Sequence, residues 1–154
     1  MNPEAMDEIE YEMMLLTRHV TRLPGHSRRT GGQLDHSAYL LLSYLDVAGP
    51  LTLRELTEAT GLETSTLSRQ TNALLRDAHA ERVPDPAGGL ARKFRITALG
   101  RRVLGEERAA GKESLGRVMS DWSARDRAAF AGFLERFNRG IESRTGRTAP
   151  RPER

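Results

Sequence analysis

Residues 51–100 read LTLRELTEATGLETSTLSRQTNALLRDAHAERVPDPAGGLARKFRITALG and carry the strongest structural signals in the chain. Thr52 is followed three residues later by Glu55, which is the spacing of a capping box and predicts the start of a helix. This helix is short because Gly61 ends it, and a second helix is expected to begin near Thr64. Two short helices joined by a tight turn form a helix-turn-helix.

A β-hairpin is predicted directly after these helices. The turn cluster Asp-Pro-Ala-Gly-Gly at residues 85–89 separates two short segments, 81–84 and 90–97, that have the character of strands. Alternation along the second segment places Lys93 and Arg95 on the face opposite its apolar side chains. A hairpin with one basic face after a helix-turn-helix predicts a winged helix-turn-helix.

The second helix of the pair has two different faces. The stripe expected to be buried recurs at i, i+4, i+7 and i+8 from Leu67. The opposite face carries hydroxyl and amide side chains with arginines and has no acid. Small polar side chains let a helix approach base edges in the major groove, and arginine can form two hydrogen bonds with guanine. The candidate DNA-binding residues are Ser65, Thr66, Ser68, Arg69, Asn72 and Arg76 in this helix, and Arg92, Lys93 and Arg95 in the hairpin.

The distribution of charge agrees with this interpretation. The chain has 154 residues, of which 24 are basic and 21 acidic, so its formal net charge is only +3. Residues 1–17 hold five acids and no base, whereas residues 88–102 hold five bases and no acid. A local basic block is typical of a surface that meets a phosphate backbone, and a solvated charged surface is the alternative interpretation.

Several classes of protein are excluded or disfavoured. The chain has no cysteine, which excludes disulfides, thiolate metal sites and thiol redox sensing. No run of about 18 apolar residues occurs, and the acidic start differs from a signal peptide, so we expect a cytoplasmic, nucleoid-associated protein with no membrane contact. The histidines lack a paired metal-binding spacing, and no nucleophile elbow or phosphate-binding glycine loop appears, so we predict no metal, no cofactor and no enzymatic activity. These histidines are His19, His26, His36 and His79.

Helices are expected on both sides of this lobe. Hydrophobic residues make up only 38% of the chain, so a core completed by a second subunit is expected. An a/d seam runs from Met6 to Leu23 on an otherwise acidic helix that Pro24-Gly25 ends, and it suits a partner subunit or, alternatively, the core of its own chain. A last helix is expected from Ser123. The candidate dimerisation residues are Ile9, Met13, Leu16, Val20, Phe130, Phe133 and Phe137.

The predicted fold is therefore mainly α with a small β-hairpin wing. Four regions are expected: an N-terminal dimerisation helix and loop (1–34), a winged helix-turn-helix lobe (35–100), C-terminal dimerisation helices (101–144) and a disordered tail (145–154). The flanking helices of two subunits would bring two lobes together. Such a dimer can read two half-sites of one duplex.

The stretch from residue 51 to residue 100 resembles the MarR family of bacterial transcriptional regulators. The matching motifs are a Ser-Thr-Leu-Ser-Arg core at 65–69, an Asp-Pro wing turn at 85–86, and Ile-Thr-Ala-Leu-Gly at 96–100. The flanking helices also match the family's layout. Three positions depart from the family pattern: Gly88 and Gly89 stand where an Asp-Arg pair is common at the wing tip, and His79 stands where an apolar residue is usual.

This resemblance implies a homodimer that binds a pseudo-palindromic operator and represses a promoter. Members of the family commonly release DNA when a small aromatic or anionic ligand binds between the dimerisation helices and the DNA-binding lobe. The alternative is a winged helix that binds proteins and not DNA, but such a helix would expose apolar or acidic residues. The candidate ligand-binding residues are Met13, Arg22, His36, Tyr39 and Tyr44.

Overall fold

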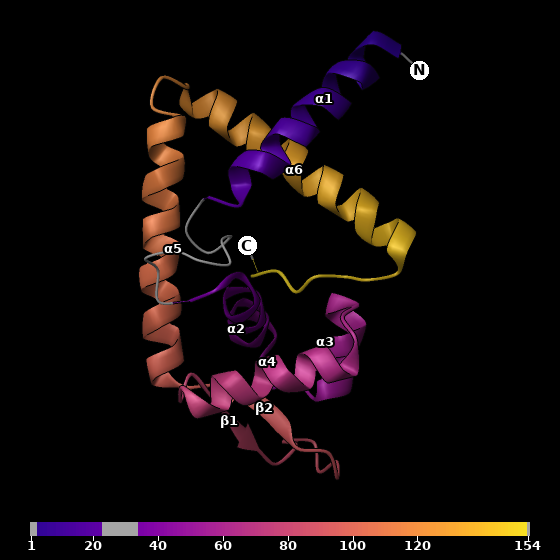
Figure 1. Cartoon of the computed structure of the whole chain (residues 1–154), viewed down its shortest axis with the longest axis vertical. Coiled ribbons are helices and arrows are strands. Elements are labelled where there is room, and N and C mark those ends of the chain that lie inside the picture. Colours follow the sequence, from indigo (N-terminus) through magenta and orange to yellow (C-terminus); the bar gives the residue numbers. More distant parts are fainter. Residues whose placement is uncertain (1–2, 23–33, 154) are drawn as a thin grey trace.

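The computed structural model describes residues 3–22 and 34–153, which form helices and one β-hairpin (Figure 1). In this view α1 and α6 overlap at the top of the molecule, and the hairpin lies at the bottom, below α2, α3 and α4. The long helix α5 runs along one side and connects the two ends. The elements are α1 (Pro3–Val20), α2 (His36–Ala48), α3 (Leu53–Thr60), α4 (Thr64–Arg76), β1 (Ala80–Val83), β2 (Lys93–Ile96), α5 (Ala98–Val118) and α6 (Ala124–Thr145).

Local capping interactions start these helices where the sequence predicts. The Thr52 hydroxyl accepts a hydrogen bond from the Glu55 amide, and the Glu55 carboxylate accepts one from the Thr52 amide, so the capping box is confirmed. The Asp35 carboxylate accepts a hydrogen bond from the Ala38 amide and caps α2, and the Ser123 hydroxyl accepts one from the Asp126 amide and caps α6. Gly61 ends α3 in the left-handed conformation, with φ of 68°, which glycine adopts without steric cost.

The core lies inside the winged helix-turn-helix lobe and the first turns of α5. Helix α2 contributes three of its leucines, and every other element of the lobe adds at least one buried side chain. Helix α6, in contrast, has no buried residue. The buried hydrophobic residues are Leu34, Leu41, Leu42, Leu45, Leu56, Leu67, Leu74, Ala80, Phe94, Ile96, Val103 and Leu104.

The wing is a two-stranded antiparallel sheet whose register pairs Ala80 with Ile96 and Val83 with Lys93. The first strand begins one residue before the predicted segment at 81–84 and has the same length, whereas the second covers only residues 93–96 of the predicted 90–97. Leu51 extends the sheet by exchanging two backbone hydrogen bonds, of 3.0 and 2.8 Å, with Phe94. The wing is therefore bonded to the segment that leads into α3.

Near both ends of the chain the structure differs from the sequence-based predictions. Helix α1 ends at Val20, short of the predicted seam limit at Leu23, and the predicted stop at Pro24-Gly25 lies outside the described residues. The sequence predicts disorder from residue 145, whereas the structure places residues 147–153 as extended backbone and bonds Arg151 to Glu142. Within residues 3–22 and 34–153, no helix combines the length and apolar character of a membrane span.

Candidate DNA-binding surface

Helix α4 presents the polar face that the sequence predicts. Leu67, Thr71 and Leu74 are buried against the core, and the Thr71 hydroxyl donates to the Leu67 carbonyl at 2.8 Å. On the other side Ser65, Arg69, Asn72 and Arg76 are exposed, while Thr66 and Ser68 are half-buried. The six predicted helix residues therefore lie on one element, four of them open to solvent.

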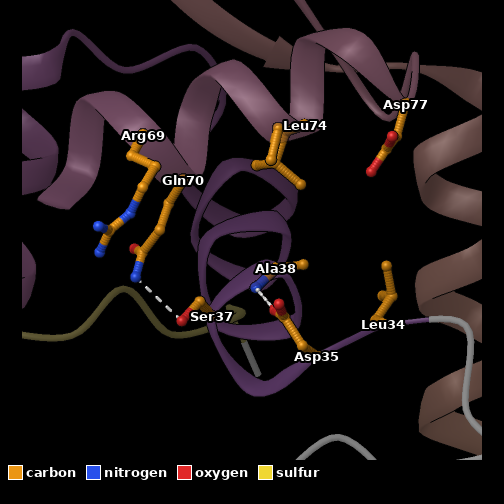
Figure 2. A pocket seen from close by; sticks show the side chains of 9 residues that line it. Leu34, Asp35, Ser37, Ala38, Arg69, Gln70, Leu74 and Asp77 are labelled. Atoms are coloured by element: carbon orange, nitrogen blue, oxygen red, sulfur yellow. Dashed lines mark hydrogen bonds between the residues drawn. The ribbon is translucent and has the colours of Figure 1, made fainter. Parts of the chain in front are cut away.

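Arg69 lies at the border between this face and a hollow beside α2 (Figure 2). Its side chain and that of Gln70 extend from α4 toward the first turn of α2. There the Gln70 amide nitrogen donates to the Ser37 hydroxyl at 3.0 Å, which joins the two helices. The hollow has a volume of about 370 Å³, and Asp35 and Asp77 are among its other lining residues. Arg69 is thus a predicted contact that also lines this cavity, and together with Thr66 it lines a neighbouring hollow beside α2.

Arg82, which the sequence analysis did not single out, joins the wing to α4. Its guanidinium lies 5.7 Å from the centre of the Phe94 ring, and its Nη2 donates to Asn72 Oδ1 at 3.4 Å. Arg82 pairs with Phe94 in the hairpin register. The position of Arg82 on β1, across the hairpin from an aromatic residue, is a signal that could have revealed it.

The three basic residues predicted in the hairpin have different environments. The Lys93 ammonium lies 3.4 Å from a Glu55 carboxylate oxygen and 3.8 Å from an Asp85 oxygen, and its side chain is only 16% exposed. Lys93 therefore lies opposite the buried Phe94 and Ile96, as the alternation predicts, but acids from α3 and the wing turn pair with its charge. Arg95 pairs with Glu81 across the hairpin at 2.8 Å but stays half-exposed, and Arg92 is exposed.

Glu55 connects the wing to the start of α3. The Thr52 amide holds the pKa of the Glu55 carboxyl below its usual value by hydrogen bonding to the charged form, and Lys93 lowers it further. Asp85 on the wing turn accepts a hydrogen bond from the Ala87 amide at 2.9 Å. The same side chains thus cap a helix, order the turn and hold Lys93.

The tip of the wing has glycines, Gly88 and Gly89, at the two positions where the family commonly has an Asp-Arg pair. Gly88 has a φ of 84° and its amide donates to the Asp85 carbonyl at 2.9 Å, so the turn requires a left-handed residue here. Gly89 follows, and its Cα faces the Asp85 carboxylate so closely that a Cβ would clash. The departure from the family pattern at the wing tip is therefore built into the turn.

Only two of the predicted ligand-binding residues line one cavity. Tyr39 and Tyr44 border a cleft of about 650 Å³ between α2 and α5, together with Arg108 and Lys112. His36 borders a different hollow, next to α4, and neither Met13 nor Arg22 borders these two cavities. Burial raises the pKa of the Tyr44 phenol, and the nearby Glu142 carboxylate raises it further.

The predicted dimerisation residues are largely open to solvent. On α1, Ile9, Met13 and Leu16 are exposed and Val20 is half-buried, and the phenylalanines of α6 are exposed, Phe133 by 65%. Exposed apolar surface of this extent on two helices is typical of a protein interface. No group of residues within the described ranges could hold a metal ion, and His26 lies outside those ranges.

The model of the MarR family matches residues 33–89. A helix-turn-helix regulator of Bacillus subtilis (strain 168), the uncharacterized YxaD, is 36% identical over 140 residues, which cover 91% of this chain and 97% of YxaD.

Solved structures have the same fold. A MarR family protein from Bacillus stearothermophilus superposes with a TM-score of 0.78 at 20% identity, covering 92% of this chain and 98% of that one. The Streptomyces coelicolor regulator PcaV, solved with its natural ligand, has a TM-score of 0.53 at 22% identity, covering 92% and 94% of the two chains. These matches confirm the predicted fold, which is mainly helical with a hairpin wing. They also confirm the prediction that the protein is a regulator and not an enzyme. The chain belongs to the MarR family of transcriptional regulators.

Proposed function

We propose that this chain is a sequence-specific repressor that binds a pseudo-palindromic DNA operator as a homodimer in the cytoplasm, at the nucleoid. The observation that carries the proposal is the exposed face of α4, which combines small polar side chains with arginines and contains no acid. Such a face suits the major groove, where serine and asparagine reach base edges and arginine pairs with guanine.

Within this proposal the contacts divide into two kinds. Arg69, Asn72 and Arg76, with Ser65, Thr66 and Ser68, lie on α4 and contact base edges or the phosphates beside the groove. Arg92 and Arg95 on the wing contact phosphates, because both are exposed and neither lies on the α4 face. Lys93 holds the wing against α3 in place of a phosphate contact, since Glu55 and Asp85 already neutralise it.

The homodimer is supported by the apolar surface of α1 and α6. One chain leaves several apolar side chains of both helices exposed, and Val20 at the end of α1 is half-buried; the exposed ones are Ile9, Met13 and Leu16 on α1 and Phe130, Phe133 and Phe137 on α6. A two-fold dimer places two copies of α4 on one face of the duplex, and their spacing must match one helical turn of about 34–36 Å.

A small aromatic or anionic effector is proposed for the cleft at Tyr39 and Tyr44. Two phenol rings and the cations of Arg108 and Lys112 border it, a combination suited to an aromatic carboxylate. Arg108 is already paired with Asp46 at 2.7 Å, so Lys112 supplies the freer charge. PcaV, which was solved with its natural ligand, supports a ligand in a protein of this fold.

Selection of duplexes from a random pool tests the proposal directly. The wild-type protein should enrich an inverted repeat, and Arg69→Ala should lose preference at one position in each half-site. Arg117→Ala is the matched control, because Arg117 lies on α5 and pairs with Glu113 in the preceding turn. Failure to enrich any sequence would favour the alternative, a winged helix that binds a protein.

A further inference from the structure

The last residues of the chain return toward the DNA-binding lobe after α6 ends. Gly146 ends α6 with a φ of 68°, a left-handed turn that redirects the backbone. Residues 147–153 then run as extended chain between helices α1 and α6 and the lobe (Figure 1). This segment, which we call the strap, has three separate points of attachment.

The first attachment is at the turn of the helix-turn-helix. The guanidinium of Arg147 packs directly on Gly61, so closely that a Cβ on Gly61 would overlap it. Gly61 is the residue that ends α3 before α4 begins. Arg147 therefore touches the turn that sets the angle between the two helices.

The second attachment is a two-pronged ion pair. Arg151 donates from Nη2 to one oxygen of Glu142 at 2.6 Å and from Nη1 to the other at 2.9 Å. Both side chains are largely shielded, with 27% and 16% of their surface exposed. A bidentate pair of arginine and carboxylate fixes orientation as well as distance. It anchors the strap to α6, nine residues away in sequence.

The third attachment is at the Tyr39–Tyr44 cleft. Pro150 and Pro152 form part of its wall, opposite residues of α2 and α5. The strap thus contacts the turn of the lobe, the end of α6 and the proposed effector cleft within seven residues. Proline restricts the backbone of this segment, which lowers the entropic cost of holding it in place.

We infer that residues 147–153 act as a strap that ties the end of α6 to the turn between α3 and α4 and closes the effector cleft, with the Glu142–Arg151 pair as its latch. The regulatory meaning rests on the proposed function, because it concerns the same cleft and the same lobe. A ligand that fills the cleft displaces the prolines, and displacement of the strap frees the lobe to move relative to α6. The device therefore links occupancy of the cleft to the position of α4.

Limited proteolysis with trypsin of the full-length protein tests the latch. Trypsin cleaves the bond after Arg147, but not the Arg151–Pro152 bond, so substitution of Arg151 leaves the set of cleavable bonds unchanged. Arg151→Gln and Glu142→Gln should each accelerate the release of residues 148–154 about tenfold, as expected for loss of a charge-assisted pair. The double variant should be no faster than either single variant, because both remove the same interaction.

The matched control is Arg117→Gln, which removes an arginine–glutamate pair of 2.6 Å on α5 that does not touch the strap. Its cleavage after Arg147 should keep the wild-type rate. Equal rates in all variants, or an equal acceleration in Arg117→Gln, would overturn the inference.

Hydrogen exchange tests the attachment to the lobe independently. Arg147→Ala and Arg151→Gln should both speed exchange of the amides at residues 61–63 and leave exchange in the middle of α5 unchanged. Unchanged exchange at residues 61–63 would refute a strap that restrains the turn. Neither measurement uses DNA, so a failure of DNA binding would remove the proposed function without touching the strap as a structural tie.

Discussion

Replacement of Lys93 distinguishes a residue that holds the wing from one that contacts DNA. The Lys93 ammonium lies 3.4 Å from Glu55 and 3.8 Å from Asp85, and 16% of its side chain is exposed. Two unit charges about 4 Å apart attract by roughly 4 kcal/mol at an effective dielectric constant of about 20. Desolvation of the ammonium and the 41% exposure of Glu55 offset most of this attraction. We therefore expect Lys93→Ala to lower the free energy of unfolding by about 1–2 kcal/mol.

Two measurements on the same variants check this expectation. Urea unfolding followed by circular dichroism should show the loss for Lys93→Ala and for Lys93→Met, which keeps most of the aliphatic stem. The matched control is Arg92→Ala, in the residue directly before Lys93. Its free energy of unfolding should stay within about 0.5 kcal/mol of the wild-type value because Arg92 is exposed.

The salt dependence of operator binding gives the second measurement. Arg92→Ala should reduce the slope of log K against log salt by about 0.9, the value for one phosphate contact, whereas Lys93→Ala should leave that slope unchanged. A Lys93→Ala protein with wild-type stability and a slope reduced by about 0.9 would refute the reasoning and return Lys93 to the DNA interface.

The remaining predictions concern base recognition, assembly, acid stability and helix capping. Arg69→Ala should weaken operator binding by about 1–3 kcal/mol and reduce base preference at one position per half-site. A mobility-shift titration in which the variant binds the operator as tightly as the wild type would contradict this. Phe133→Asp should yield monomers in analytical ultracentrifugation, because it places a charge in the exposed apolar surface of α6, and a persistent dimer would exclude that face. The pKa of Glu55 is lower in the folded chain than in the unfolded chain. Its contribution to the free energy of unfolding is therefore fully present above the unfolded pKa and is lost as the pH falls through the folded pKa. In that pH window, the free energy of unfolding of Glu55→Gln should depend less on pH than that of the wild type. Thr52→Ala should cost about 1 kcal/mol in thermal unfolding, through loss of the cap of α3.

The sequence was sufficient for features whose partners lie within a few residues. The capping box of Thr52 and Glu55, the stop at Gly61 and the two faces of α4 follow from spacings of three and four residues, which a helix brings together whatever surrounds it. The order of these elements predicted the winged helix-turn-helix, and the resemblance of the motifs at 65–69, 85–86 and 96–100 pointed to the family.

The tertiary structure alone decided the features whose partners are distant in sequence. Lys93 has the same alternation as Arg95, yet it is neutralised by Glu55, 38 residues away, because packing of the wing places that carboxylate beside it. Packing of the elements also brings Arg82 next to Asn72. It places Tyr44 in the wall of a cleft that Met13 does not border. The strap has no local signal at all, since its contacts with Gly61 and the cleft depend on how α6 ends relative to the lobe. Periodicity reports which face of an element is apolar, whereas charge pairing between elements depends on where the whole fold brings them together.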